Sequence, residues 1–298
     1  DENYKDIIDR NFQNPNFKFK LKLVNKLSDL KLINFNKNNY EGIIISSDKL
    51  VESFDFSFMQ NYNLSFISLK DWCRTYLQRY PPEFISSFDI LKINRILKDK
   101  SYEIQLKRIA DIFLSLIILL ICSPILLFFS CLIFLEDRGP IIYSQIRTGL
   151  NSKCFRIYKL RSMYVNSEKN GATWAISNDS RISKVGKIIR ATRIDELPQL
   201  ISVLKGEMSL IGPRPERPEF DQLLHKKIPF YYERYLVKPG LSGWAQVNYP
   251  YGASIFDTTK KLSFDIYYIS HFSIFLDLLI LFKTIKLVLN ARGSKPKI

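Results

Sequence analysis

The sequence predicts a mixed α/β (α+β) fold in three parts, and three observations lead to this prediction. Residues 1–105 alternate short apolar runs with helical stretches, which is typical of α/β architecture. Residues 112–135 contain no charged side chain over 24 positions, and they mark a membrane segment that we place at 106–137. Residues 136–273 are polar and dense in turns, an apolar stretch follows at 274–290, and we expect a mostly helical domain at 138–298.

The chain is strongly basic. Its 298 residues include 44 Lys and Arg against 29 Asp and Glu, which gives a formal net charge of +15. Such an excess favours an anionic partner, namely nucleic acid, an acidic lipid surface or a phosphorylated substrate. The sequence has no RNA-binding or zinc-finger signature, and a nucleic-acid-binding protein has no place for the uncharged run. The two His and four scattered Cys also argue against a His/Cys metal site and against a disulfide framework.

The N-terminal part has the pattern strand, weak helix, strand, helix, which suggests a piece of α/β architecture. Residues 42–45 predict a buried strand that ends at 46–48, and residues 64–69 predict a second strand. Residues 71–77 predict a helix that ends before two consecutive prolines. No G-x-G-x-x-G motif is present, so a working dinucleotide site has no support.

The apolar run is compatible with two membrane topologies. As one helix, residues 112–135 would be ~36 Å long, enough to cross a ~30 Å hydrocarbon core. However, Ser123-Pro124 lies at the midpoint, and an interior proline removes one hydrogen bond and kinks a helix. Both flanks are basic, and the positive-inside rule places such flanks on the cytoplasmic side. The residues alone therefore allow either a single spanning helix or a helix-break-helix hairpin.

The C-terminal stretch 274–290 predicts a long apolar helix. Lys283, Lys286 and Asn290 fall on one stripe of it at 100° per residue. This pattern suits a helix that lies at a membrane interface, and it also suits a core helix of the globular part.

The clearest candidate for chemistry is the adjacent pair Asp195 and Glu196. The pair could simply begin a helix, because Thr192-x-x-Asp195 resembles a capping box and acidic residues suit a first turn. The same geometry also suits catalysis, because a helix N-terminus attracts anions. A carboxylate there can attack phosphorus, and a second carboxylate can help to hold Mg²⁺.

Cationic residues surround this pair in the sequence. Arg181 and Arg190 precede it, and Arg214 follows it between two prolines in a rigid turn. Arginine makes bidentate contacts with phosphate, so a fixed guanidinium indicates a phosphate site. A solvated basic face is the alternative explanation for the other cations.

Five motifs then occur in a fixed order. They are Ser123-Pro124, Lys159-x-Arg161-Ser162-Met163, Asp195-Glu196-Leu197-Pro198-Gln199, the run from Lys205 to Pro215, and Lys238-Pro239-Gly240-x-x-Gly243-Trp244-Ala245-Gln246-Val247-Asn248. In this order they resemble the bacterial sugar transferases, the monotopic polyprenyl-phosphate phosphoglycosyl transferases, over about residues 105–293.

The resemblance implies a reaction and a set of site residues. It implies that Asp195 attacks the sugar-bearing phosphate of a UDP-sugar and releases UMP, after which polyprenyl (undecaprenyl) phosphate takes the phosphosugar. Glu196 completes the catalytic pair, and the two carboxylates hold Mg²⁺. The residues implied to contact substrate or phosphate are Lys159, Arg161, Arg181, Arg190, Arg214 and Gln246. One departure is Tyr249-Pro250-Tyr251-Gly252, where smaller members have Gly-Arg, and this leaves the sugar specificity open.

The resemblance also implies an architecture. It implies a partial Rossmann-like regulatory domain at 1–105, truncated at its start, and a re-entrant membrane helix at 106–137 that breaks at Ser123-Pro124. It implies a catalytic domain at 138–298 with an interfacial C-terminal helix, on the cytoplasmic face of a bacterial inner membrane. The expected partners are the UDP-sugar, the polyprenyl phosphate and the phospholipid membrane, with no nucleic acid, and a homo-oligomer is left open. The expected pathway is exopolysaccharide or O-antigen synthesis.

Two other functions are left open by the residues. One is a membrane-bound glycosyltransferase that releases UDP, although the Asp-x-Asp metal motif common in such enzymes is absent. The other is a non-catalytic basic membrane scaffold, which would have no need of Asp195 and Glu196.

Overall fold

The computed structural model describes residues 42–45, 65–165, 167, 179–249, 252 and 254–290. The chain divides into two compact units, Asp1–Gln78 and Arg79–Ile298, and each is described by itself. The predicted strand end at 46–48 lies outside the described residues, as do Pro250 and Tyr251 of the departing segment.

The first unit contains a parallel pair of strands and a helix. Strand β1 (Gly42–Ile45) pairs in parallel with β2 (Ser65–Ser68), and α6 (Leu69–Thr75) follows at once. Both predicted strands are confirmed, but the helix begins two residues earlier than predicted. The reason is Ser68, whose side chain accepts a hydrogen bond from the Asp71 N–H and so caps the first turn. Two strands are fewer than a Rossmann-like sheet, so that assignment stays a prediction.

The second unit begins with helices and leads into one very long apolar helix. The short turn η1 (Pro82–Phe84) and helix α7 (Ser87–Asp99) precede α8 (Ser101–Asp137), which has 37 residues. Among the described residues, α8 is the one helix long and apolar enough to cross a membrane. Its apolar side chains are mostly exposed, which is unlike a core helix of a soluble domain.

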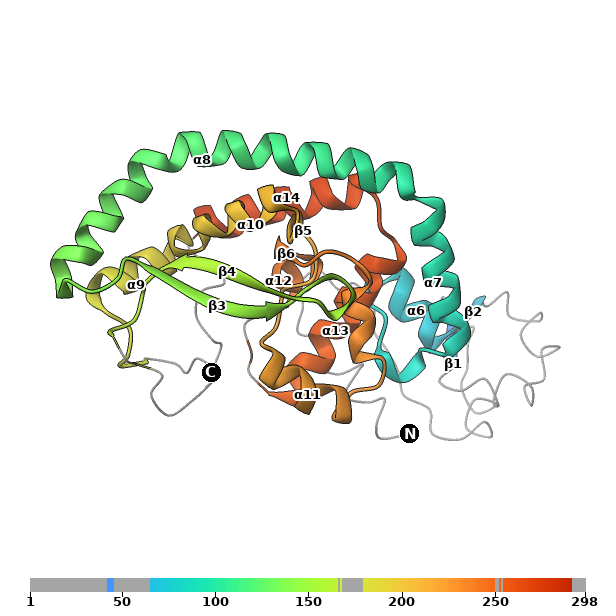
Figure 1. Ribbon diagram of the computed structural model, residues 1–298. Coiled ribbons are helices and arrows are strands. Elements are labelled where there is room, and N and C mark those ends of the chain that lie inside the picture. The colour runs from blue at the N-terminus through green and yellow to red at the C-terminus, as the bar shows by residue number, and fades with distance from the viewer. Residues whose placement is uncertain are drawn as a thin grey trace, which may run out of the picture. The chain divides into compact units, whose positions relative to one another are not determined.

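The predicted break at Ser123-Pro124 is wrong. Helix α8 continues through Pro124 as one helix, and Figure 1 shows it bowed over α10 and α14. Proline has no N–H to donate to the carbonyl four residues earlier, which belongs to Leu120. The Ser123 hydroxyl donates to that same carbonyl at 2.8 Å, so the carbonyl keeps a partner and the helix continues.

The remaining chain forms two small sheets and a group of short helices. Strands β3 (Ile142–Thr148) and β4 (Cys154–Leu160) form an antiparallel hairpin around η2 (Leu150–Ser152). Strand β5 (Ser209–Ile211) pairs in parallel with β6 (Gly240–Ser242). The helical elements are α9 (Lys184–Ala191), η3 (Ile194–Gln199), α10 (Leu200–Lys205), α11 (Pro218–Lys227), η4 (Tyr231–Leu236), α12 (Trp244–Asn248), α13 (Ile255–Ser270) and α14 (Ile274–Leu289).

The core of this unit lies between α10, α12 and α13. Val203, Met208, Trp244, Leu262 and Tyr268 are all buried in it. Each fully buried large apolar side chain contributes roughly 1.5–3 kcal/mol relative to exposure. This core therefore gives the loops around it a rigid base.

Helix α14 is not a core helix. Ile280 is its one buried residue, whereas Phe275 is 85% exposed and Leu289 is 81% exposed. Lys283, expected on the polar stripe, instead faces α12, where its Nζ donates to Asn248 at 2.9 Å and lies 4.3 Å from the Trp244 ring centroid. Of the two predicted environments, the apolar outer face of α14 fits the membrane interface.

Candidate active site

The pair Asp195 and Glu196 lies at the junction between α9 and α10. Helix α9 ends at Ala191, Arg193 takes a left-handed conformation with φ of 62°, and η3 begins with the pair in its first turn. The left-handed conformation costs a non-glycine residue roughly 1–2 kcal/mol. The chain changes direction here, between α9 and the pair.

The predicted capping box is not formed. The Thr192 hydroxyl donates back to the Ile188 and Ile189 carbonyls at the end of α9, and no side chain caps η3. The pair is therefore not explained by helix capping. Its position at the start of a helical segment is confirmed, although the first turn is a 3-10 turn.

Asp195 is buried and incompletely paired. It is 7% exposed, and its Oδ1 has no hydrogen-bond partner. An unpaired buried acceptor costs about 1–3 kcal/mol. Burial raises the pKa of Asp195 to about 6, and the negative charge of Glu196 also raises it, while the cations Lys159, Arg193 and Arg190 act in the opposite direction. Oδ1 is thus an acceptor without a partner.

Glu196, in contrast to Asp195, is paired with several cations. Its Oε1 accepts from Arg214 Nη2 at 2.6 Å and from Lys159 Nζ at 3.0 Å, and Oε2 lies 3.7 Å from Arg193 Nη1. Burial acts to raise its pKa, but the charges of Arg214, Lys159 and Arg193 together hold that pKa well below its usual range. The two adjacent carboxylates are therefore electrostatically distinct, as in sites where paired acids take different roles.

A buried polar network holds the loop that carries Arg214. Arg234 donates to the Arg214 carbonyl at 3.0 Å and forms an ion pair with Asp265, also at 3.0 Å. Arg147, from β3, donates to the Pro215 carbonyl at 3.1 Å. Because these contacts hold the backbone at Arg214 and Pro215, the side chain of Arg214 starts from a fixed position beside Glu196.

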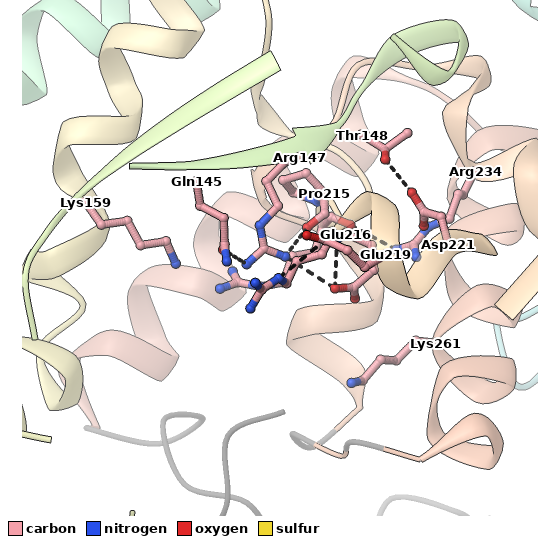
Figure 2. A network of polar contacts seen from close by, with 12 residues as sticks. Gln145, Arg147, Thr148, Lys159, Pro215, Glu216, Glu219, Asp221, Arg234 and Lys261 are labelled. Carbon is pink, nitrogen blue, oxygen red and sulfur yellow. Dashed lines mark hydrogen bonds and ion pairs between the residues drawn. The ribbon is translucent and has the colours of Figure 1, made fainter. Parts of the chain in front are cut away.

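Three more cations gather around Glu216 in the same loop. Arg147 donates to Glu216 Oε1 at 3.3 Å, and the Arg217 backbone N–H donates to the same oxygen at 3.1 Å. Lys261, from α13, donates to the Gly252 carbonyl at 2.5 Å and interacts electrostatically with Glu216 and Arg214. Figure 2 shows Lys159 and Lys261 extending toward this group from different elements. Burial lowers the pKa of both Arg147 and Lys261, and the positive charge of Arg214 lowers both further.

Sequence reasoning did not assign these cations to the site. Arg147 and Arg217 lie outside the five motifs. Lys261 lies in no motif and comes to the site from α13, as Figure 2 shows. The proline-flanked turn was the one local signal that pointed to this region.

The structure places the other predicted residues outside this group. Arg161 pairs with Asp137 at the end of α8, and Arg181 pairs with Asp179 at 2.6 and 2.8 Å. Gln246, in α12, donates to the Leu241 carbonyl of β6 at 3.1 Å, within its own motif. Arg190 influences Asp195 through its charge. The predicted residues that the structure brings together are thus Asp195, Glu196, Lys159 and Arg214, with Arg190 nearby.

The donor atoms fit a hard cation that also binds substrate phosphates. The described residues contain no group of three or more His, Cys, Asp or Glu that could hold a metal by itself. Asp195 nevertheless has a free buried oxygen, and Glu196 Oε2 has only the distant contact to Arg193. Mg²⁺ commonly takes one or two carboxylates and completes its shell with phosphate oxygens and water.

Comparison with known proteins gives a consistent result. Residues 102–291 match the profile of the family described as bacterial sugar transferase. A UDP-N-acetylgalactosamine-undecaprenyl-phosphate N-acetylgalactosaminephosphotransferase of Aeromonas hydrophila is 50% identical over 190 residues, which are 64% of this chain and 45% of that protein. An undecaprenyl-phosphate glucose phosphotransferase of Komagataeibacter xylinus is 38% identical over 226 residues, 74% of this chain and 39% of that protein.

A third relative is a shorter protein. A putative undecaprenyl-phosphate N-acetylgalactosaminyl 1-phosphate transferase of Bacillus subtilis is 52% identical over 131 residues, 44% of this chain and 73% of that protein. The chain spans less than half the length of the first two relatives. The matched region includes α8 and the whole candidate site.

Proposed function

The chain belongs to the bacterial sugar transferase family, and we propose that it transfers a sugar 1-phosphate from a UDP-sugar to polyprenyl (undecaprenyl) phosphate. The observation that carries this proposal is the unequal carboxylate pair, with Asp195 buried and incompletely paired beside a Glu196 that three cations neutralise. The three relatives are named for undecaprenyl-phosphate sugar-phosphate transfer, which agrees with it.

The pair supports a two-step covalent mechanism. In the first step an Asp195 oxygen attacks the phosphorus that carries the sugar, and the bond from this phosphorus to the bridging oxygen breaks. The electron pair goes to that oxygen, and UMP leaves. In the second step a phosphate oxygen of the lipid attacks the same phosphorus, the bond to Asp195 breaks, and polyprenyl-diphospho-sugar forms. Two steps allow an aqueous and a lipid substrate to react in turn at one carboxylate.

The surrounding cations stabilise the transferred phosphate. A bound Mg²⁺, held by Asp195 and Glu196, would neutralise phosphate charge. Arg214 and Lys159 lie against Glu196 and can turn toward phosphate oxygens as negative charge develops. With a pKa of about 6, Asp195 is mostly ionised at neutral pH and needs no separate base.

The contacts of α8 support a placement on one face of a membrane. Near its start, Lys107 pairs with Asp277 of α14 at 2.6 Å. At its end, Asp137 pairs with Arg161, and Glu136 accepts from the Lys184 N–H at 2.8 Å. Both ends are thus held by the same unit, whereas a spanning helix would separate them by a bilayer. We infer that α8 enters and leaves the membrane on the cytoplasmic side.

Labelling tests this topology. In a background without native cysteines, Arg95→Cys and Lys153→Cys place one exposed probe on each side of α8. In intact cells, protection of both probes from an impermeant thiol reagent supports entry from one face. Labelling of one probe alone contradicts it.

Product analysis tests the reaction. The purified chain should release UMP from at least one UDP-sugar when undecaprenyl phosphate is present, and a panel containing UDP-glucose and UDP-N-acetylgalactosamine would identify the sugar. Asp195→Asn should abolish both turnover and a phosphosugar adduct on the protein. Release of UDP would instead support a conventional glycosyltransferase, and an adduct mapped to another residue would remove Asp195 from its role.

A further inference from the structure

A second group of cations lies away from the carboxylate pair, where α8 meets the end of α10. The space above Gly206, where any other residue would place its Cβ, is bordered by Arg108 Nη2 at 3.4 Å and Lys238 Nζ at 3.6 Å. Gly206 has a φ of +84° and ends α10, so its position favours glycine. Two positive charges from distant parts of the chain therefore lie near the same point, next to the Gly206 backbone.

The two cations differ in how they are paired. Arg108 donates to the Val203 and Leu204 carbonyls, and so caps the carbonyl end of α10. Lys238 makes no hydrogen bond or ion pair within the described part of the chain, although it is half-buried. Burial lowers the pKa of Lys238 and the charge of Arg108 lowers it further, while Asp111 acts in the opposite direction. Two cations thus face one carboxylate, and Asp111 already accepts from the Leu210 N–H at 3.1 Å.

The position of this group relative to the apolar run indicates its ligand. Arg108 precedes the first residue of the uncharged run, Ile112, by four positions on the same helix, which is a rise of roughly 6 Å. The polar layer on each side of a hydrocarbon core is about 5–8 Å thick. When the run of α8 lies in the hydrocarbon, this group lies at the level of lipid phosphates. The neighbouring cation on α8, Lys107, is already paired with Asp277.

We propose that Arg108 and Lys238, which lie together beside Gly206, form a binding site for the phosphate of an anionic membrane lipid. The site is separate from the Glu196 pair and from the cations around Glu216. It depends on the proposed membrane placement of α8 but not on the proposed chemistry. Bound phosphate would complete the pairing of Lys238 and hold the start of α8 at the membrane surface.

Thermal unfolding of the full chain in uncharged detergent tests the site. Phosphatidylglycerol should raise the unfolding temperature above that in phosphatidylcholine. Lys238→Gln should weaken the apparent affinity for phosphatidylglycerol about fivefold, since each basic residue near a lipid surface contributes about 1 kcal/mol. Lys238→Arg should retain the effect. Lys226→Gln, an equal loss of charge at an exposed position on α11, should behave as the unaltered chain does.

Measurements with other ligands distinguish the source of the phosphate. A Lys238-dependent shift with undecaprenyl phosphate and none with phosphatidylglycerol assigns the site to the substrate lipid, and still supports lipid phosphate binding. An equal shift with inorganic phosphate alone, or an unchanged response in Lys238→Gln, would overturn the proposal. A chain that needs no detergent and does not sediment with vesicles would instead contradict the membrane placement of α8. UMP release, measured separately, reports on the proposed reaction.

Discussion

The unequal carboxylate pair predicts a pH profile whose midpoint moves in opposite directions in two variants. Asp195 must be ionised to attack phosphorus, and its pKa is about 6 because burial and the charge of Glu196 raise it. The rate of the first step should therefore rise with pH through about 6. Glu196→Gln removes the negative neighbour and should lower the midpoint. Lys159→Met removes a cation that favours the ionised form, and should raise it.

The size of the effect follows from the titration. With a pKa of about 6, roughly a tenth of Asp195 is ionised at pH 5. Burial, the larger cause of the shift, remains in Glu196→Gln, so the pKa should fall only part of the way to about 4, the ordinary value for Asp, at which roughly nine tenths would be ionised at that pH. Relative to its own plateau, the variant should therefore be faster at pH 5, by at most about ninefold, the limit set by complete return to the ordinary pKa. The plateau itself should be lower in this variant, because loss of Glu196 also removes a proposed Mg²⁺ ligand. Dividing each profile by its own plateau removes this effect from the comparison.

The assay is single-turnover UMP release without the lipid acceptor, between pH 4.5 and 8, with each profile divided by its own plateau. Arg156→Gln is the control, because it removes an exposed charge from the same strand as Lys159. Its profile should match that of the unaltered chain. Midpoints that stay together in all four proteins would refute the assignment of the titration to Asp195. A midpoint that rises in Glu196→Gln would refute the electrostatic reasoning.

Three further predictions concern the metal, the apolar helix and the buried network. Excess EDTA should stop UMP release and added Mg²⁺ should restore it; full activity in EDTA would exclude the metal. Ser123→Ala should leave the Leu120 carbonyl without a donor, at a cost of about 1 kcal/mol, and hydrogen exchange should increase in the middle of α8 but not at its ends. Asp265→Ala should leave Arg234 buried without its carboxylate and lower the free energy of unfolding by about 3–5 kcal/mol, and a loss below 1 kcal/mol in denaturant unfolding would contradict this.

The parts of the site that could be predicted lie in short local patterns. The two adjacent carboxylates are visible in the sequence, and the prolines beside Arg214 indicate a rigid turn without any knowledge of the fold. Lys159 belongs to a motif of its own, and its contact with Glu196 at 3.0 Å required the hairpin to pack on η3. Local patterns therefore identified the groups, but tertiary packing decided which of them meet.

The parts that could not be predicted depend on partners far apart in the sequence. Arg161 belongs to the same motif as Lys159, yet it pairs with Asp137 of α8, a contact that no spacing rule indicates. Lys261 reaches the loop at Glu216 from α13, and no motif marks it. The capping box failed for a local reason, because Arg193 takes a left-handed conformation that redirects the chain before Asp195.

In α8 the predicted effect of the proline failed, but the inference that both ends of the helix lie on one side of the membrane keeps its support. In the sequence, Pro124 indicated a break and the basic flanks indicated a one-sided topology, which the resemblance also implied. The hydroxyl of Ser123 supplies the hydrogen bond that proline lacks, so the first indication does not hold. One-sided placement is instead favoured by the contacts at the two ends, Lys107 with Asp277 and Asp137 with Arg161. It follows that Pro124→Ala should leave the topology unchanged, whereas loss of both end contacts should release α8 from the unit that holds it.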